Sequence, residues 1–265
     1  GGVRFDGVTV RYSDSTPPVL RDVTLEVAPG TTLGVCGRTG SGKSSLLLAL
    51  FRVLELDDAG GRITIDGVDT RSVGMGTLRG SLSIIPQDPV LFAGTVAYNL
   101  DPKGGAADDD MWDALTKASP DLSSRIRNGQ GLQTLVSEGG NNLSRGQRQL
   151  LCIARALLQK RKILVLDEAT SSIDTQTDAL IQETIRREFV DRGVTVITVA
   201  HRLDTVLSYD NILVLGAGRM LEYGPPARLL ERRGGRPGYL RRLVDADARK
   251  KEYGRAVPAV AAVGS

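Results

Sequence analysis

The segment GRTGSGKS (37–44) has the residue types and the spacing of a phosphate-binding loop. It fits G-x-x-x-x-G-K-[ST] and lies between a strand-like run, 31–36, and a helix-like run, 43–54. Glycines let the backbone wrap around phosphate oxygens, so that successive N–H groups and a helix N-terminus face the anion. We expect Lys43 to reach the β- and γ-phosphates and the Ser44 hydroxyl to ligate Mg²⁺. The alternative, a plain glycine-rich turn, is disfavoured by the strand-to-helix context.

A second candidate is ILVLDE (163–168), an apolar strand that ends in two carboxylates. In α/β folds, ligands bind at the carboxyl ends of the strands. We expect Asp167 to hold the Mg²⁺ shell and Glu168 to orient or deprotonate the attacking water. Many buried strands end in Asp or Glu, so the pattern alone is weak evidence. It indicates a Mg²⁺ site here because a phosphate-binding loop precedes it in the chain.

A third candidate is LSRGQ (143–147), at the start of a helix that continues to about Leu158. Ser144 is a good N-cap, and the free amides after it would form a second anion site. An ordinary Ser-capped helix is the alternative, because a single chain has no obvious use for two anion sites.

These candidates require an α/β framework with a helical insertion. Apolar runs with mostly period-two spacing predict strands in the first third, and β-α-β alternation resumes after about residue 161. Between about Phe92 and Lys160 the strand pattern stops, and Asp108, Asp109 and Asp110 suit a helix N-terminus. The predicted strands cover 3–12, 23–27, 31–36, 63–67, 81–86, 162–168, 194–200 and 211–216, and the predicted helices 43–54, 108–118, 144–160 and 176–190.

Composition is that of a globular protein, with 41% hydrophobic and 25% charged residues among 265. The net charge of +3 comes from scattered basic residues, which disfavours a nucleic-acid-binding groove. Cys36 and Cys152 lie in apolar runs, and we interpret both as reduced core thiols. No apolar run approaches the roughly 18 residues of a membrane span. The chain begins at Gly1 without a signal-peptide pattern and looks like a piece of something longer.

Taken in order, GRTGSGKS, Gln87 in IIPQDP, LSRGQ, ILVLDE, SSID (171–174) and His201 in VAHR resemble an ABC-transporter nucleotide-binding domain. The resemblance extends from about Val3 to Leu243. It implies a P-loop NTPase core, mainly a parallel sheet with flanking helices, an antiparallel β-subdomain at the N-terminus and an inserted α-helical subdomain. It also implies that two such domains pair head-to-tail around two ATP molecules with Mg²⁺.

The same resemblance assigns roles to individual residues. Gln87 would sense the γ-phosphate and Mg²⁺, and His201 would contact the γ-phosphate, although a lone histidine near a strand end is more often structural. Tyr12 would stack on adenine rather than serve as a half-buried strand aromatic. The implied catalytic residues are Glu168, His201, Lys43 and Gln87, and the implied metal ligands are Ser44, Gln87 and Asp167. The implied ATP-contacting residues are Tyr12, Gly37, Arg38, Thr39, Gly40, Ser41, Gly42, Lys43, Ser44, Ser45, Ser144, Gly146, Gln147 and Asp174.

Two longer segments, 81–102 and 138–158, are most similar to the second nucleotide-binding domain of C-subfamily, multidrug-resistance-associated exporters. Arg145 stands where the usual signature LSGGQ has its first glycine. This departure implies an asymmetric dimer with a different nucleotide-binding domain, in which this chain's Lys43, Glu168 and His201 build the competent site. The other implied partners are the transmembrane domains of the parent transporter, at the cytoplasmic face of a membrane, and no nucleic acid.

We expect a nucleotide-binding domain over 1–250, with its ATP-binding core in 1–92 and 161–250 and a helical signature subdomain over 93–160. Residues 251–265 are expected to form a disordered tail. The alternatives are a nucleotide-sensing regulatory domain of a channel-type C-subfamily protein and a soluble ABC ATPase. A P-loop kinase is disfavoured by LSRGQ, SSID and VAHR together.

Overall fold

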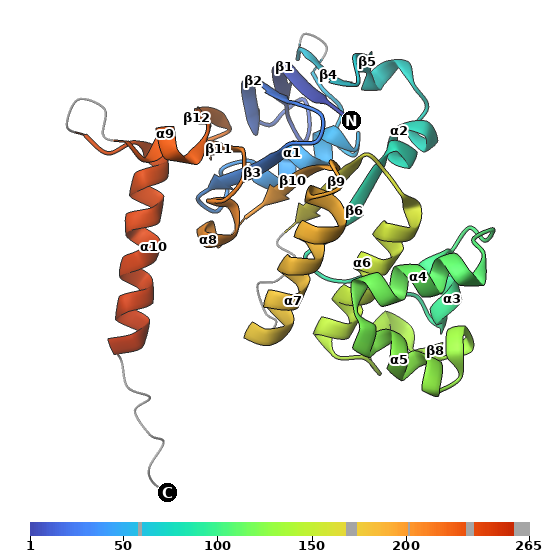
Figure 1. Ribbon diagram of the computed structural model, residues 1–265. Coiled ribbons are helices and arrows are strands. Elements are labelled where there is room, and N and C mark those ends of the chain that lie inside the picture. Colours follow the sequence, from blue (N-terminus) through green and yellow to red (C-terminus); the bar gives the residue numbers. More distant parts are fainter. Residues whose placement is uncertain (58–59, 168–173, 201, 232–235, 257–265) are drawn as a thin grey trace, which may run out of the picture.

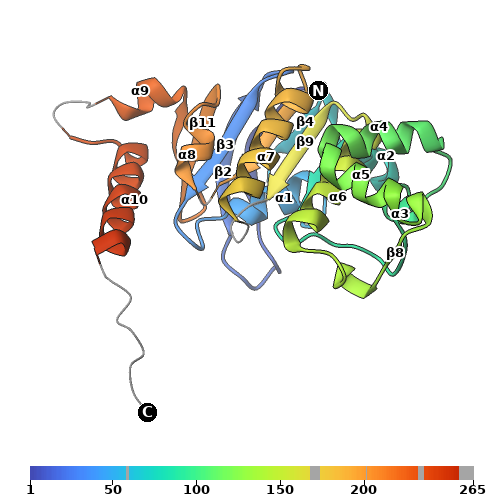
Figure 2. The same cartoon turned by 60° about the horizontal axis from the view of Figure 1, so that its bottom comes forward.

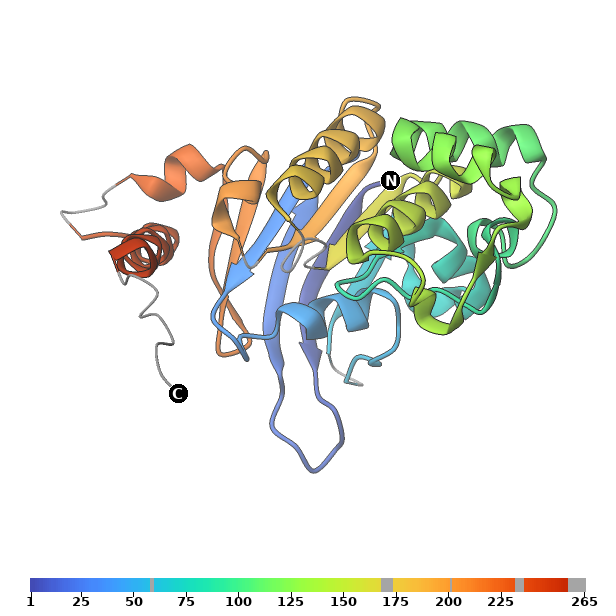
Figure 3. The same cartoon turned by 90° about the horizontal axis from the view of Figure 1, so that it is seen from below.

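The computed structural model describes residues 1–57, 60–167, 174–200, 202–231 and 236–256. Two β-sheets share an apolar core, and a group of helices, α3 to α6, lies to one side of them (Figure 1). The long helix α10 (Tyr239–Ala256) stands on the other side of the sheets (Figure 3). This is the predicted P-loop NTPase type of fold.

The larger sheet has the strand order β12-β11-β3-β10-β9-β6, and its strands are parallel except for β12, which is antiparallel to β11. The central strands β3, β9 and β10 are mostly apolar because both of their faces are buried. In β9, Leu164 and Leu166 face the core that includes α7, whereas Val165 faces the core that includes α1. Figure 2 shows α7 lying across the sheet. The strands are β3 (Thr32–Gly37), β6 (Leu82–Ile85), β9 (Ile163–Asp167), β10 (Thr195–Val199), β11 (Asn211–Gly216) and β12 (Arg219–Gly224), and the two helices are α1 (Lys43–Leu50) and α7 (Thr175–Ile185).

The register of this sheet aligns the ends of its strands. Val199 in β10 lies between Val35 in β3 and Asp167 in β9. On the far side of β9, Leu166 pairs with Ile85 in β6. The loops that follow β3, β6 and β9 therefore leave the sheet at the same edge.

The smaller sheet is antiparallel, with the order β2-β1-β4-β5. Along β2, Val23, Leu25 and Val27 are buried while Thr24 and Glu26 between them are exposed, which is the alternation of a strand with one face on a core. Its buried side chains pack with α1 against the larger sheet. The strands are β1 (Val3–Val10), β2 (Leu20–Val27), β4 (Arg62–Ile65) and β5 (Val68–Asp69).

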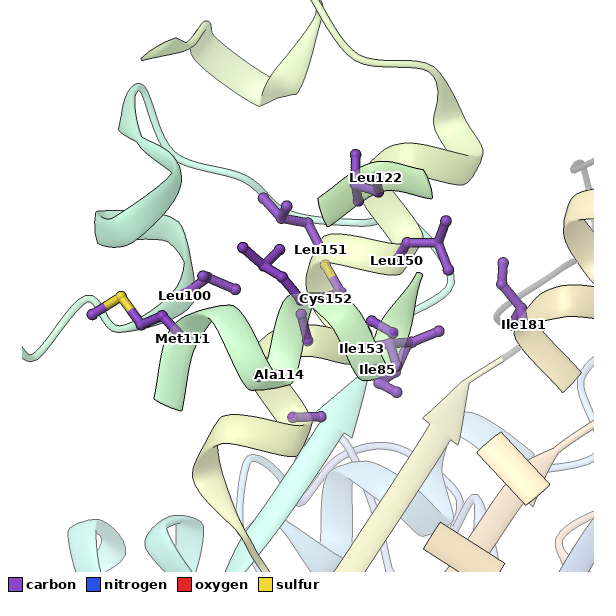
Figure 4. Close-up of a cluster of buried hydrophobic side chains, with 14 of the residues drawn as sticks. Ile85, Leu100, Met111, Ala114, Leu122, Leu150, Leu151, Cys152, Ile153 and Ile181 are labelled. Carbon is purple, nitrogen blue, oxygen red and sulfur yellow. The ribbon is translucent and has the colours of Figure 1, made fainter. Parts of the chain in front are cut away.

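The helical group packs into the same core as α7 and one face of the larger sheet, shown in Figure 4. Leu151 and Ile153 of α6 are buried there together with Leu100, Met111 and Leu122 from three other helices. Helix α4 spans Asp108–Ala118 as predicted, with the three aspartates in its first turn and Lys117 in its last. The group comprises α3 (Val96–Leu100), α4, α5 (Pro120–Asn128), α6 (Arg145–Gln159) and the paired strands β7 (Gly94–Thr95) and β8 (Leu135–Val136).

Some helix ends differ from those predicted. The helix predicted over 43–54 ends at Leu50, because Arg52 adopts a left-handed backbone conformation with φ 49° and its guanidinium donates to the carbonyls of Thr70 and Val73. Helix α10, which extends to Ala256, was not among the predicted helices. Several short helices were not predicted from periodicity: α2 (Met75–Ser81), α8 (Leu203–Val206) and α9 (Pro226–Leu230).

Candidate nucleotide-binding site

The loop between β3 and α1 has the backbone that phosphate binding requires. Gly40 and Gly42 have φ of 75° and 104°, values that L side chains rarely adopt. At Gly37, an added β-carbon would lie 2.4 Å from the carbonyl oxygen of Leu215. Gly42 is the N-cap of α1 and supplies no side-chain cap, so the first amides of the helix are left for an anion.

Lys43 lies inside this loop with only 6% of its surface exposed. Its Nζ donates to the carbonyl oxygens of Gly37 at 3.0 Å and Arg38 at 3.2 Å. Burial lowers the pKa of Lys43, while the nearby Cys36 and Asp167 act in the opposite direction. The nearby groups therefore offset only part of the cost of burying the ammonium, and an anion in the loop would stabilise its charged form.

The residues present fit a nucleotide phosphate with Mg²⁺. The buried Ser41 Oγ has no hydrogen-bond partner among the described residues, within a loop whose next helix is uncapped. Ser44, one residue after Lys43, is exposed, and Asp167 ends β9 at the same sheet edge. The described residues contain no group of three or more His, Cys, Asp or Glu side chains that could hold a metal by themselves. Mg²⁺ does not need one, because it is usually held by one or two protein ligands together with substrate phosphates.

Tyr12 lies near the start of α1. The residue is 60% exposed, and its hydroxyl lies 3.2 Å from the Oγ of the buried Ser45. The bond to Ser45 holds the ring beside the phosphate-binding loop while leaving ring surface accessible. Ser45 thus contacts Tyr12 directly, a contact that spacing alone does not reveal.

Gln87 follows β6 and is exposed. Strands β6 and β9 are neighbours, and Ile85 at the end of β6 pairs with Leu166 in β9. Gln87, two residues after the end of β6, and Asp167, the last residue of β9, therefore lie at the same edge of the sheet. The Gln87 carbonyl oxygen accepts a hydrogen bond from Arg145 Nη2 at 3.4 Å. The signature segment is therefore tied to the main chain at Gln87.

Ser144 is the N-cap of α6, as predicted. Its Oγ accepts from the Gln147 amide at 3.2 Å, and the Gln147 side chain accepts from the Ser144 amide at 3.0 Å, forming a capping box. Gly146, in the first turn, is buried against Thr177 of α7.

Asp174 is the N-cap of α7, and its Oδ1 accepts from the Thr177 amide at 2.9 Å. Hydrogen bonding to Thr177 holds the pKa of Asp174 below its ordinary value. Thr177 therefore touches both predicted sites, Gly146 through its side chain and Asp174 through its backbone.

The predicted residues Glu168 and His201 lie outside the described residues. Arg202, the residue that follows His201 in the chain, donates to the carboxylate of Asp178, a buried residue of α7. Sequence reasoning missed this pair, as it missed Asp88, which binds Arg145 at 3.0 Å. The partners are far apart in the chain, so no local pattern marks them.

With this geometry in place, comparison with known families identifies the chain. The ABC transporter family model matches residues 20–171, more than half of the chain. The chain belongs to the ABC transporter family. It is the nucleotide-binding, ATP-hydrolysing domain of this family, as the motifs predicted.

Relatives of this ABC domain are C-subfamily proteins, which confirms that part of the sequence-based resemblance. ATP-binding cassette sub-family C member 2 of Rattus norvegicus is 52% identical over 235 residues, covering 88% of this chain and 15% of that protein. Multidrug resistance protein mrp-7 of Caenorhabditis elegans is 50% identical over 231 residues, covering 87% of this chain and 15% of that protein. ATP-binding cassette sub-family C member 8 of Homo sapiens is 47% identical over 233 residues, covering 88% of this chain and 14% of that protein.

A solved structure also superposes on this ABC domain. It is a bacterial Atm1-family ABC exporter with ATP bound, with a TM-score of 0.82 and 37% identity, covering 93% of this chain and 42% of that one. The chain spans about 15% of the length of the curated relatives. Among the helices that the structure describes, none has both the length and the apolar composition of a membrane span.

Proposed function

We propose that this ABC domain binds Mg-ATP at the Lys43 loop and hydrolyses it in a head-to-tail dimer that powers export by a membrane transporter. The observation that supports this most strongly is the register of the larger sheet. Val199 in β10 pairs with Val35 in β3 on one side and with Asp167 in β9 on the other. The phosphate-binding loop, which follows β3, and the predicted Mg²⁺ ligand Asp167, which ends β9, therefore lie at the same edge of the sheet. The buried Lys43, whose pKa is lowered by burial, provides the cation at the same edge.

Each residue then has a task in phosphoryl transfer to water, which depends mainly on positioning and charge stabilisation. The uncapped amides at the start of α1 and the Lys43 ammonium bind the β- and γ-phosphates. Ser44, Asp167 and Gln87 hold Mg²⁺, which neutralises charge on the phosphates when bound. Glu168 aligns or deprotonates the attacking water, and His201 contacts the γ-phosphate.

The second anion site at α6 is explained by pairing. Ser144 and Gly146 would contact the γ-phosphate held by a partner domain, and Asp174 would lie between the two sites. This role is supported by the contact of Gly146 with Thr177, which places the start of α6 beside the start of α7. Arg145 in place of the usual glycine favours a heterologous partner. This chain's Lys43 site is then the competent one, and its own signature faces a site that mainly holds ATP.

The transmembrane domains would dock on the helical group, at the cytoplasmic face of the membrane. Close to Gln87, Phe92 and Tyr98 are 45% and 46% exposed and form an edge-to-face pair with centroids 6.1 Å apart. Val90 is also exposed, and so is Leu135, which pairs with Thr95 through strands β8 and β7. A patch of this kind is typical of a protein contact surface, and because Val90 and Phe92 follow Gln87 closely in the chain it would relay nucleotide state to the membrane helices.

The test is Glu168→Gln in the longer parent protein. We expect ATP turnover to be abolished while Mg-ATP binding is kept and the closed dimer accumulates. Lys43→Ala is the matched control, in which binding should be strongly weakened and turnover should be lost. Turnover at the wild-type rate in Glu168→Gln would remove Glu168 from its role.

The isolated chain gives a second test of the asymmetric pairing. We expect it to be monomeric by sedimentation and to hydrolyse ATP weakly, because its Lys43 site lacks a partner's signature. Robust hydrolysis by the isolated chain would contradict the asymmetric arrangement.

A further inference from the structure

The segment Pro86–Phe92, called here the Gln87 strap, is fastened along its length to α6. The Pro86 carbonyl accepts from Gln149 Nε2 at 3.4 Å, and the Val90 carbonyl accepts from Arg155 Nη1 at 3.3 Å. The Arg155 guanidinium also lies over the Phe92 ring, 5.9 Å from its centroid. The strap and α6 are thus joined through main-chain carbonyls rather than through side chains of the strap alone.

Arg145 makes the contact nearest to Gln87. Its Nη2 donates to the Gln87 carbonyl at 3.4 Å and to Asp88 Oδ1 at 3.0 Å. Arg145 and Gln149 are four residues apart and so share a face of the helix. Arg145 is also the first residue of α6, between Ser144 and Gly146. A glycine here, as in LSGGQ, has no side chain to make this contact.

The Arg145–Asp88 pair is too exposed to matter much for overall stability. The Asp88 side chain is 85% exposed and that of Arg145 is 31% exposed, and such pairs contribute little on their own. What distinguishes the pair is its place. Asp88 is next to Gln87 in the chain, and Arg145 is next to Ser144. In the proposed dimer Gln87 belongs to this chain's own nucleotide site and Ser144 to the partner's site.

We propose that Arg145 is a positioning residue that couples Gln87 to the start of α6. When Mg-ATP binds at the Lys43 loop and engages Gln87, the Arg145–Asp88 contact transmits that engagement to the first turn of α6, residues 144–148. In this turn the amides of Ser144, Gln147 and Arg148 donate within the helix, so the amides of Arg145 and Gly146 are the ones that would face the partner's nucleotide in the proposed dimer. One site of the dimer thereby becomes sensitive to the other. Coupling of this kind is reciprocal, because it is a free energy shared by the two binding events. The inference rests on the proposed binding of Mg-ATP at the Lys43 loop.

The experiment is amide hydrogen exchange on the full chain, with and without Mg-ATP, at a dilution where sedimentation velocity shows single chains. The variants are Arg145→Gln, which keeps a long helix-forming side chain without the charge, and Asp88→Asn, which is nearly isosteric. The double variant Arg145→Asp with Asp88→Arg reverses the pair. Calorimetry measures Mg-ATP binding for each variant separately.

In the wild-type chain we expect Mg-ATP to slow exchange both in the Lys43 loop and at residues 144–148. In each single variant, the loop should still be protected and Kd should stay within about fivefold of wild type, the range that an exposed ion pair supports. Protection at 144–148 should be lost in the single variants and regained in the double variant. High salt should reduce it in the wild type and not in the single variants, since exposed pairs are screened.

The outcomes separate the two proposals. If the wild-type chain does not bind Mg-ATP, the proposed function fails. If it binds but residues 144–148 are equally protected in wild type and single variants, Arg145 has no coupling role. Protection of 144–148 that arises only at concentrations where dimers form would show direct contact between chains and would also overturn the coupling within one chain.

Discussion

Gly146 and Thr177 lie so close that a β-carbon added at Gly146 would come within 2.5 Å of Thr177 Cγ2. The first turn of α6 and the first turn of α7 can meet only because residue 146 lacks a side chain. Glycine at this position therefore serves packing inside the chain, independently of any phosphate that it contacts in a dimer.

Gly146→Ala tests this packing directly. The methyl group would overpack the contact at a typical cost of about 1–3 kcal/mol, against a gain of about 1 kcal/mol in helix propensity. We expect net destabilisation in urea unfolding. In the Thr177→Ser background the clashing methyl is gone, so Gly146→Ala should there be neutral or stabilising. Additive effects of the two substitutions would show that the side chains do not interact.

Tyr12 offers a pair of variants that separate its ring from its hydroxyl. Tyr12→Ala should weaken Mg-ATP binding by about 1–3 kcal/mol if the ring stacks on adenine. Tyr12→Phe loses the bond to Ser45 but keeps the ring, and we expect a change of about 1 kcal/mol or less. Calorimetric Kd values check both. Equal losses in the two variants would mean that the hydroxyl, and not stacking, matters.

Lys43 links nucleotide binding to pH. Burial lowers the pKa of its ammonium from 10.5, and bound phosphate would favour the charged form and raise that pKa again. Binding should therefore take up protons at alkaline pH below 10.5, and affinity should fall as the pH rises through the lowered pKa. Calorimetry in buffers of different ionisation enthalpy measures the uptake.

Lys43→Met is the control for that measurement. It should weaken Mg-ATP binding by roughly 10- to 100-fold, the range for a lost charged hydrogen bond, and abolish the proton uptake. Unchanged uptake in Lys43→Met would assign the linked proton to another group.

The two cysteines are buried and free, in agreement with the sequence prediction. Burial raises the pKa of Cys36 from 9.0 to about 12 and also raises the pKa of Cys152. Neither thiol should react with a disulfide reagent near pH 8 in the folded chain, and both should react in denaturant. Rapid reaction without denaturant would show that the core opens readily.

Cys36 also predicts a pH dependence of stability. Its folded-state pKa is raised, so its contribution is fully present below the unfolded value of 9.0 and is lost as the pH rises toward about 12. Unfolding of Cys36→Ala in urea should show a smaller loss of stability over that range than the wild type. An identical loss in the variant would remove Cys36 from the effect.

Local chemistry explains why much of the site was predictable. The turn at Gly40 and Gly42 needs residues that tolerate positive φ, and the N-cap of α6 is provided by the hydroxyl of Ser144. Both requirements restrict residue types over a few neighbouring positions, so both can be recognised in the sequence. Helix α4 was predicted with both ends correct because its acidic first turn and its apolar spacing agree. The predicted end of α1 was wrong because the hydrogen-bond partners of Arg52, the carbonyls of Thr70 and Val73, lie in a separate segment of the chain.

The sequence by itself determined the chemistry of this domain: a glycine loop for phosphate, a carboxylate at a strand end, a capped helix and buried thiols. These follow from short-range sterics, hydrogen bonding and apolar periodicity, which act over a few neighbouring residues. Only the tertiary structure decided which distant groups meet, as Asp88 with Arg145 and Gly146 with Thr177 do. Such contacts depend on strand order and helix packing, and those are set by burial of the whole core rather than by any local pattern.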